Sequence, residues 1–431
     1  MEVCVVMLFS PLSKISKTRD FPYAHDEVGT STPSAKSFHY EPCVIMDSET
    51  EDQSTLVIQR DEEDSPFVIQ SSGSGPPLPL TDELASGIVI GTGKPDQVFS
   101  VMFDTGSSDL WVSSSECVVC GRKKRYDAAK SPTRSNKEED FTVGYLDNTR
   151  AFGDLTIGNI VVTEQFFLSA MGFSQKYAGK KYDGIIGMAR LPNPKGLKKD
   201  PFFVNAVNQK AVTEKEFGFR LASPASVYLG GTDESLYNKQ TREDYPLSNH
   251  ADLAWAIGGA SILVGADVAI SGLETIIDTG TNAILAKHSE VAAFYAKIPG
   301  AYSAEEDGIG FWDFPCSSVP SVSLTWGGRS WPISKEKFVF HKAGDICTGT
   351  IIGKDIGYGD KTWLVGSPYV HGIFFPSVHY LRKGHAASFL SGVYTAFSYD
   401  PNPALTRVGF AELKPQAANL SLEFGTNGIC V

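Results

Sequence analysis

The sequence has no run of about 18 or more apolar residues, so no membrane-spanning helix is expected. It also lacks an excess of positive charge: 38 Lys and Arg stand against 50 Asp and Glu, a formal net charge of −12. A nucleic-acid-binding protein needs a basic face, so nucleic acid is not an expected partner. The one Cys-x-x-Cys, Cys117 to Cys120, lacks a second such pair or a closely spaced His pair to complete a zinc site. Neither a metal nor another cofactor is therefore expected.

The composition that remains favours a globular protein rich in strands. With 42% hydrophobic and 20% charged residues, the chain is typical of globular proteins, and 431 residues suffice for two or three domains. Its 41 Gly, 24 Pro and 26 Phe favour strands and tight turns over long helices. We therefore expect a mostly β fold.

One short stretch occurs twice in the chain. Residues 101–107 read VMFDTGS, and residues 275–281 read TIIDTGT. In each copy apolar residues run into Asp-Thr-Gly and then a hydroxyl residue. A given tripeptide arises by chance in about one chain in twenty of this length. Two copies in the same context therefore indicate more than coincidence.

Each copy is followed by a second shared element. Asp183–Gly187 (DGIIG) ends 83 residues after Asp104, and Trp363–Gly366 (WLVG) ends 88 residues after Asp278. The same order at nearly the same spacing indicates an internal duplication. Two related halves, each with one carboxylate at the end of an apolar strand, predict one site on a pseudo-twofold axis.

Two carboxylates brought within a few ångströms cannot both ionise easily, so one keeps a proton while the other stays charged. Such a pair can hold a water molecule between its members. The ionised member takes a proton from the water as it attacks an amide carbon, and the protonated member donates to the developing oxyanion or the leaving nitrogen. Asp104 and Asp278 are therefore the candidate catalytic residues. The structural alternative is that each Asp caps a turn, which would be the simpler explanation for one copy alone.

The neighbours of the two aspartates suit supporting roles. We expect the threonines to hydrogen-bond across the axis, the glycines to let the backbone come close to the carboxylates, and the hydroxyl residues that follow to orient them. A tyrosine on a hairpin expected over residues 141–152 could close over a bound peptide, although a strand tyrosine also pairs across a sheet. Two tryptophans, Trp111 and Trp255, are expected in the core. The supporting residues are Thr105, Gly106, Ser107, Tyr145, Thr279, Gly280 and Thr281.

The seven cysteines allow more than one arrangement. Cys117 and Cys120 could form a zinc half-site, a redox motif or a small disulfide loop, and Cys316 with Cys347 could form another pair. Disulfides would favour an oxidising compartment.

The chain divides into four parts by composition. Residues 1–83 contain Ser/Thr/Pro-rich segments and the acidic cluster Asp61–Asp64. They are expected to be a largely flexible leader or prosegment. The short apolar run in residues 1–12 follows Glu2, whereas a secretory signal begins with positive charge; it is either an atypical signal or the true start lies elsewhere. An N-terminal lobe is expected over 84–233, a C-terminal lobe over 234–414, and a loose tail over 415–431.

These residues resemble the pepsin-like aspartic proteases from about Leu84 to Leu413. The resemblance rests on FDTGSSDLWV at 103–112, YDGIIG at 182–187, Trp255 with its following strands, IDTGT at 277–281 and VGFA at 408–411. It implies a bilobal, mostly β fold, two pseudo-twofold-related lobes with a cleft for an extended protein or peptide substrate. It further implies endopeptidase activity at acid pH, a preference for apolar side chains beside the cut, and inhibition by pepstatin-type peptides.

By position, the resemblance makes Asp104 and Asp278 the dyad and Tyr145 the flap tyrosine. It places one disulfide at Cys316–Cys347 and another near Cys117–Cys120. A zymogen that is secreted or vacuolar is expected, and a monomer, because one chain supplies both halves.

The sequence departs from the family pattern in four places. The hairpin after Tyr145 is short and carries Asp147 and Arg150, the leader is acidic where family prosegments are often basic, and Ser367 stands where the family usually has Asp. Finally, residues 373–392 interrupt otherwise continuous family sequence, either as a retained intron or mispredicted exon or as a real surface loop. The alternative function is a catalytically silent pepsin-like binding or inhibitor protein; two intact Asp-Thr-Gly motifs favour the enzyme.

Overall fold

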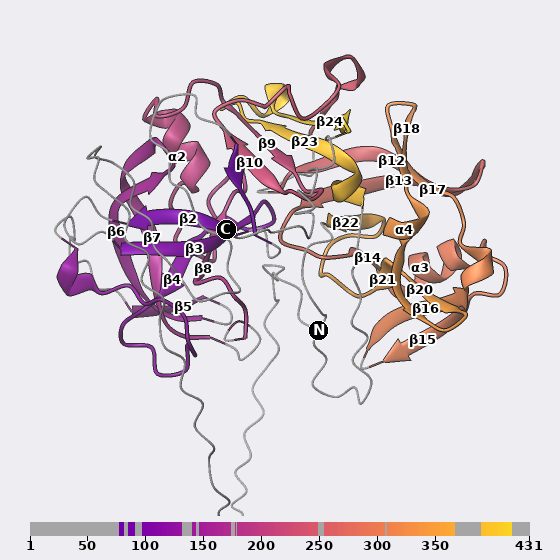
Figure 1. Cartoon of the computed structure of the whole chain (residues 1–431), viewed down its shortest axis with the longest axis horizontal. Coiled ribbons are helices and arrows are strands. Elements are labelled where there is room, and N and C mark those ends of the chain that lie inside the picture. The colour runs from indigo at the N-terminus through magenta and orange to yellow at the C-terminus, as the bar shows by residue number, and fades with distance from the viewer. Residues whose placement is uncertain are drawn as a thin grey trace, which may run out of the picture. The chain divides into compact units, whose positions relative to one another are not determined.

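The structure, a computed structural model, describes residues 77–81, 85–90, 97–131, 140–143, 146–173, 177, 179–248, 254–306, 308–366 and 389–415. Within these ranges strands predominate and form three sheets (Figure 1). None of the helices in them is long and apolar enough to span a membrane.

The first sheet is built from the first half of the chain. Its order is β2-β3-β8-β4-β7-β6-β5, with a further pairing of β2 with β6. The apolar ends of its strands are buried, as in β3, where the last four residues lie in the core. The bounds are β2 Ala85–Ile90, β3 Gln97–Asp104, β4 Leu110–Ser113, β5 Asp140–Val143, β6 Leu146–Ile157, β7 Ile160–Phe173 and β8 Gly184–Gly187.

The second sheet is built from the second half of the chain. Its order is β18-β17-β12-β13-β22-β14-β21-β16-β20-β19, and β15 pairs with β16. The bounds are β12 Ala256–Val264, β13 Asp267–Asp278, β14 Ile284–Ala286, β15 Tyr302–Glu306, β16 Ile309–Pro315, β17 Val322–Trp326, β18 Arg329–Ile333, β19 Val339–Ala343, β20 Ile346–Gly349, β21 Ile351–Gly353 and β22 Thr362–Gly366.

The third sheet combines strands from both halves, in the order β1-β10-β9-β23-β24-β11. The bounds are β1 Leu78–Pro79, β9 Glu216–Arg220, β10 Ser226–Leu229, β11 Glu243–Pro246, β23 Val393–Ser398 and β24 Arg407–Glu412. Leu78 pairs with Val227, so ordered pairing begins before the sequence-based boundary at Leu84. We call this the shared sheet.

The first two sheets repeat one topology around the two aspartates. β3 runs parallel to β8 with Asp104 opposite Gly187, and β8 runs antiparallel to β4. In the same way, β13 runs parallel to β22 with Asp278 opposite Gly366, and β22 runs antiparallel to β14. The duplication expected from sequence is therefore a duplication of strand pairing and register. It puts both aspartates at equivalent strand ends.

Helices in the described ranges are short. They are α2 Phe202–Asn208, α3 His288–Tyr295 and α4 Lys335–Phe338, with the 3₁₀ turns η1 Ala128–Lys130, η2 Lys239–Thr241, η3 Cys316–Ser318, η4 Phe389–Gly392 and η5 Pro403–Leu405. The spacing of apolar residues in the sequence predicts helices over 202–212 and 285–298, and the observed helices are shorter. The second starts later because Ile284–Ala286 pair with β21 and β22 as strand β14.

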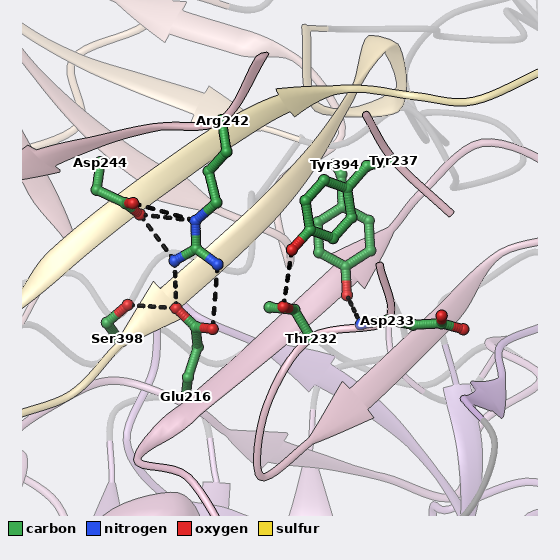
Figure 2. A network of polar contacts seen from close by, with 8 residues as sticks. All are labelled: Glu216, Thr232, Asp233, Tyr237, Arg242, Asp244, Tyr394 and Ser398. Carbon is green, nitrogen blue, oxygen red and sulfur yellow. Dashed lines mark hydrogen bonds and ion pairs between the residues drawn. The ribbon is translucent and has the colours of Figure 1, made fainter. Parts of the chain in front are cut away.

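A polar network ties the two halves together on the shared sheet (Figure 2). The Arg242 guanidinium contacts the carboxylates of Glu216 on β9 and Asp244 on β11, and the Ser398 hydroxyl on β23 donates to Glu216. Beside it the rings of Tyr237 and Tyr394 stack with centroids 4.5 Å apart. An Arg fork held by two carboxylates fixes the register of strands that come from different halves.

Candidate active site

Asp104 and Asp278 are buried where their strands end, with side chains 0% and 1% exposed. Each loop lies against the carboxyl group of the other half. A Cβ on Gly106 would lie 2.5 Å from Asp278 Cγ, and a Cβ on Gly280 would lie 2.3 Å from Asp104 Oδ1. Only glycine leaves room for this approach. The two loops therefore face each other across a common centre.

Within each loop the same two donors hold the carboxylate. Gly106 N–H donates to Asp104 Oδ1 at 2.9 Å and the Ser107 hydroxyl to Oδ2 at 2.5 Å. In the second loop, Gly280 N–H donates to Asp278 Oδ1 at 2.8 Å and the Thr281 hydroxyl to Oδ2 at 2.6 Å. Each carboxylate is thus fixed in orientation by its own loop.

Two threonines cross-link the loops. Thr105 N–H donates to Thr279 Oγ1 at 3.1 Å, and Thr279 N–H donates to Thr105 Oγ1 at 3.0 Å. Their hydroxyls donate onward to carbonyls of the opposite strand, Thr105 to Ile277 at 2.9 Å and Thr279 to Phe103 at 2.7 Å. These four buried bonds join the halves at the residue that follows each aspartate.

The electrostatics of the pair are those of two carboxyls sharing one site. Burial raises the pKa of the Asp278 carboxyl well above its ordinary value. The charge of Asp104 and a hydrogen bond between the two side chains raise the pKa further, while the Thr281 hydroxyl and Gly280 N–H oppose the rise. A proton is therefore retained on the pair to higher pH than on an isolated carboxyl. Because the groups are coupled, that proton belongs to the pair.

The second element of each repeat closes behind the aspartates. A Cβ on Gly187 would lie 2.3 Å from the Ser108 carbonyl carbon, and one on Gly366 would lie 2.2 Å from the Thr281 carbonyl oxygen. Glycine at these positions lets β8 and β22 pass close to the backbone of the two aspartate loops. This close approach is the physical reason that Gly187 and Gly366 end the second element in each half.

Two carboxylates that sequence reasoning gave no role support the first loop. Asp109 Oδ1 accepts from Leu197 N–H at 3.1 Å, and burial raises the pKa of Asp109 to about 6, against the lowering effect of Leu197 N–H and Asn193. Asp183 accepts from Ser100 N–H at 2.9 Å and from Lys124 N–H at 2.8 Å. Both lie inside the motifs SSDLW and YDGIIG. The acidic residues of these motifs are the sequence signal from which the two carboxylates could have been predicted.

Some sequence-based expectations lie outside the described residues. Strands β5 and β6 pair as the expected hairpin, with Val143 opposite Leu146. Tyr145 lies outside the described ranges, as do Ser367 and residues 373–388 of the expected insertion.

Both expected cysteine pairs are disulfides. Cys117 is bonded to Cys120 and Cys316 to Cys347. The Cys117–Cys120 bond is the small disulfide loop that the sequence allowed, and sulfurs bonded to each other do not ligate zinc.

Two repeated β-sheets, each delivering one buried aspartate to a common centre and joined by a third sheet, define the class of bilobal, mostly β acid proteases. A family model described as eukaryotic aspartyl protease matches residues 85–378. The chain belongs to this family and is an aspartic-type endopeptidase.

Individual relatives agree with this assignment. An aspartic protease of Phaffia rhodozyma is 34% identical over 290 residues, covering 64% of this chain and 70% of that protein. Cathepsin D of Gallus gallus is 33% identical over 314 residues, covering 65% and 75%. Pepsin A of Suncus murinus is 29% identical over 306 residues, covering 66% and 76%.

Proposed function

We propose that Asp104 and Asp278 are the catalytic dyad of this endopeptidase and activate a water molecule against a peptide bond. The observation that carries the proposal is the reciprocal packing of each Gly against the opposite carboxyl, together with the hydrogen bond between the two carboxyls. Aspartic proteases are the standard example of two carboxyl groups that share one proton.

The reaction needs only the pair and water. The ionised carboxyl takes a proton from water as the water oxygen bonds to the peptide carbon, and the protonated carboxyl donates to the carbonyl oxygen. The amide nitrogen then takes the proton from the carboxyl that the water has protonated, and a hydroxyl of the resulting diol gives its proton to the other carboxylate. The C–N bond breaks, and an acid and an amine leave. The pair is left singly protonated, as it began. We do not divide base and acid between Asp104 and Asp278, because the loops are equivalent.

We further propose an acid pH range, because the singly protonated pair is lost as pH rises through its raised pKa. The substrate is an extended protein or peptide segment with apolar side chains beside the cut. Thr105, Gly106, Ser107, Thr279, Gly280 and Thr281 support the dyad, and Tyr145 is the proposed flap residue.

Maturation and location complete the proposal. The chain is a zymogen from which a leader within residues 1–83 is removed, leaving lobes predicted over 84–233 and 234–414 and a tail over 415–431, active as a monomer. Two disulfides support a secreted or vacuolar location, because such bonds persist in oxidising compartments.

A cleavage assay on the purified chain tests these proposals. A quenched peptide with an apolar pair at its centre is incubated from pH 3 to 7, with and without pepstatin. We expect cleavage that falls as pH rises and is abolished by pepstatin, and N-terminal sequencing should find a mature start near residue 78–84. Well-folded protein that never cleaves would favour the silent binding protein instead.

A further inference from the structure

Trp255 was expected to be a core residue, and it is buried, with 1% of its surface exposed. Its ring packs on two aromatic side chains of the shared sheet. Its centroid lies 5.7 Å from that of Phe217 on β9 and 5.1 Å from that of Phe397 on β23, both in T-shaped contact. This packing alone would make Trp255 an ordinary core side chain.

Its hydrogen bonds reach both aspartate loops. The Trp255 indole N–H donates to the Met188 carbonyl at 2.9 Å, and Met188 N–H donates to the Asp104 carbonyl at 2.7 Å. On the other side, Ile277 N–H donates to the Trp255 carbonyl at 2.9 Å, and Ile277 directly precedes Asp278. A chain of three hydrogen bonds therefore runs from the backbone of one aspartate to the backbone beside the other, with Trp255 at its centre.

This series of three hydrogen bonds differs from the threonine cross-link. The threonines bond to each other across the two loops, whereas Trp255 bonds to Met188 on one side and Ile277 on the other and packs on the shared sheet. Rigid holding of two reacting groups matters in catalysis, because displacement of about 1 Å can reduce the rate about 100-fold.

We propose that Trp255 is a positioning residue, whose indole N–H and main-chain carbonyl set the separation of the two carboxyl groups. The inference rests on the proposed dyad. It assigns Trp255 no contact with substrate or water. It predicts that loss of the indole N–H releases Met188, and with it the Asp104 backbone, while Asp278 stays in place.

The first test is Trp255→Phe, which keeps an aromatic ring and the main-chain carbonyl but removes the N–H. We expect kcat to fall between about 10- and 100-fold with KM changed less than about twofold. Because wider separation weakens the repulsion that raises the upper apparent pKa of the pair, the alkaline limb of the kcat–pH profile should move to lower pH.

Trp331→Phe is the matched control. Trp331 is equally buried, and its indole N–H donates to the Tyr245 hydroxyl at 3.0 Å, away from both aspartate loops. It should lose about as much thermal stability as Trp255→Phe but keep the wild-type kcat and pH profile. Equal stability losses with unchanged kcat and pH profile in both variants would overturn the proposal.

Trp255→Phe could also fail to fold, so a closer isostere is needed. Incorporation of 3-benzothienylalanine at position 255 replaces the N–H with sulfur and keeps the ring shape. This variant should show the same kcat loss and pH shift; wild-type kinetics would overturn the proposal. If the wild-type protein shows no pepstatin-sensitive cleavage, the proposed endopeptidase function is wrong. If the wild type cleaves and the position-255 variants have wild-type kinetics, only the positioning role of Trp255 is wrong.

Discussion

Four buried hydrogen bonds of Thr105 and Thr279 hold the two aspartate loops together. Replacing Thr105 with Val keeps the shape of the side chain but removes its hydroxyl. Ile277 C=O then loses its donor and Thr279 N–H its acceptor, and each orphaned buried group costs about 1–3 kcal/mol. We expect Thr105→Val to lower the free energy of unfolding accordingly and to reduce kcat, measured by denaturant unfolding and peptide cleavage.

Thr350→Val is the control for that substitution. Thr350 is also fully buried, but within the described part of the chain its hydroxyl has no hydrogen-bond partner. The change should be neutral or slightly stabilising, because a buried unsatisfied hydroxyl is removed. If the two valine variants were equally stable, the cross-link would contribute nothing.

The buried carboxyl of Asp109 makes the free energy of unfolding depend on pH. Its ordinary pKa is 3.8, and burial raises the pKa to about 6 in the folded chain. The folded chain therefore holds this proton where the unfolded chain has lost it, so the free energy of unfolding falls as pH rises from about 4 to 6. The fall amounts to about 3 kcal/mol at most.

Asp109→Asn should remove that contribution. An amide oxygen can still accept from Leu197 N–H, and it has no charge to desolvate. We expect the thermal midpoint of the variant to decline less between pH 4 and pH 7 than that of the wild type. Parallel declines would show that Asp109 does not supply the pH dependence.

Among the elements, η4 changes the interpretation of the expected insertion at 373–392. Its Phe389 ring packs 5.3 Å from Trp326 and 5.2 Å from Phe410, and Lys337 Nζ donates to the Ser391 carbonyl. The sequence-based boundary at Gly392 therefore lies inside a core element. The string YVHG at 369–372 has the same order of aromatic, aliphatic, polar and Gly residues as FLSG at 389–392. The repeated string means that removal of either 369–388 or 373–392 restores a continuous sequence of the same pattern.

Phe389→Ala tests whether η4 is part of the core. Removal of a buried Phe ring should lower the free energy of unfolding by about 3–5 kcal/mol. Leu405→Ala, at a side chain 57% exposed on η5, should change it by less than about 0.5 kcal/mol. Similar effects in urea unfolding would remove η4 from the core.

Deletion of residues 369–388 tests the rest of the segment. The shortened chain keeps Phe389–Gly392 directly before β23, so we expect it to fold and to cleave peptide at about the wild-type rate, since loop length costs little. Deletion of 373–392 would instead offer Tyr369 and Val370 to the same packing site. If only the full-length chain folds, the segment is a required part of the protein and neither an artefact nor a dispensable loop.

The strands around the two motifs were the predictable elements. Apolar runs ending in Asp-Thr-Gly predicted β3 and β13, because each run is short and bounded by turn residues. The matched elements downstream are strands β8 and β22. Helix ends were harder to predict: apolar spacing placed a helix over 285–298, but tertiary pairing with β21 and β22 makes Ile284–Ala286 a strand.

For the whole molecule, the site could be predicted further than the framework that holds it. Asp104 and Asp278 with their supporting residues followed from repetition and side-chain chemistry. The shared sheet did not, because it pairs segments as distant as Leu78 with Val227 and Arg220 with Tyr394. The bridging bonds of Trp255 were equally hidden, since they depend on main-chain groups that carry no sequence signal.

The two halves each contribute one carboxyl to the proposed dyad. Asp104→Asn and Asp278→Asn each remove the shared proton system but keep the shape of the side chain. Asp267→Asn, an exposed change on the same strand as Asp278, is the control. All three variants should be checked for wild-type thermal midpoints before kinetics.

The most direct measurement is kcat/KM for a quenched peptide at the acid optimum. The account predicts that Asp104→Asn and Asp278→Asn each lose at least about 1,000-fold, and that Asp267→Asn loses nothing. A folded Asp104→Asn or Asp278→Asn protein that stays within about 10-fold of wild type would contradict it.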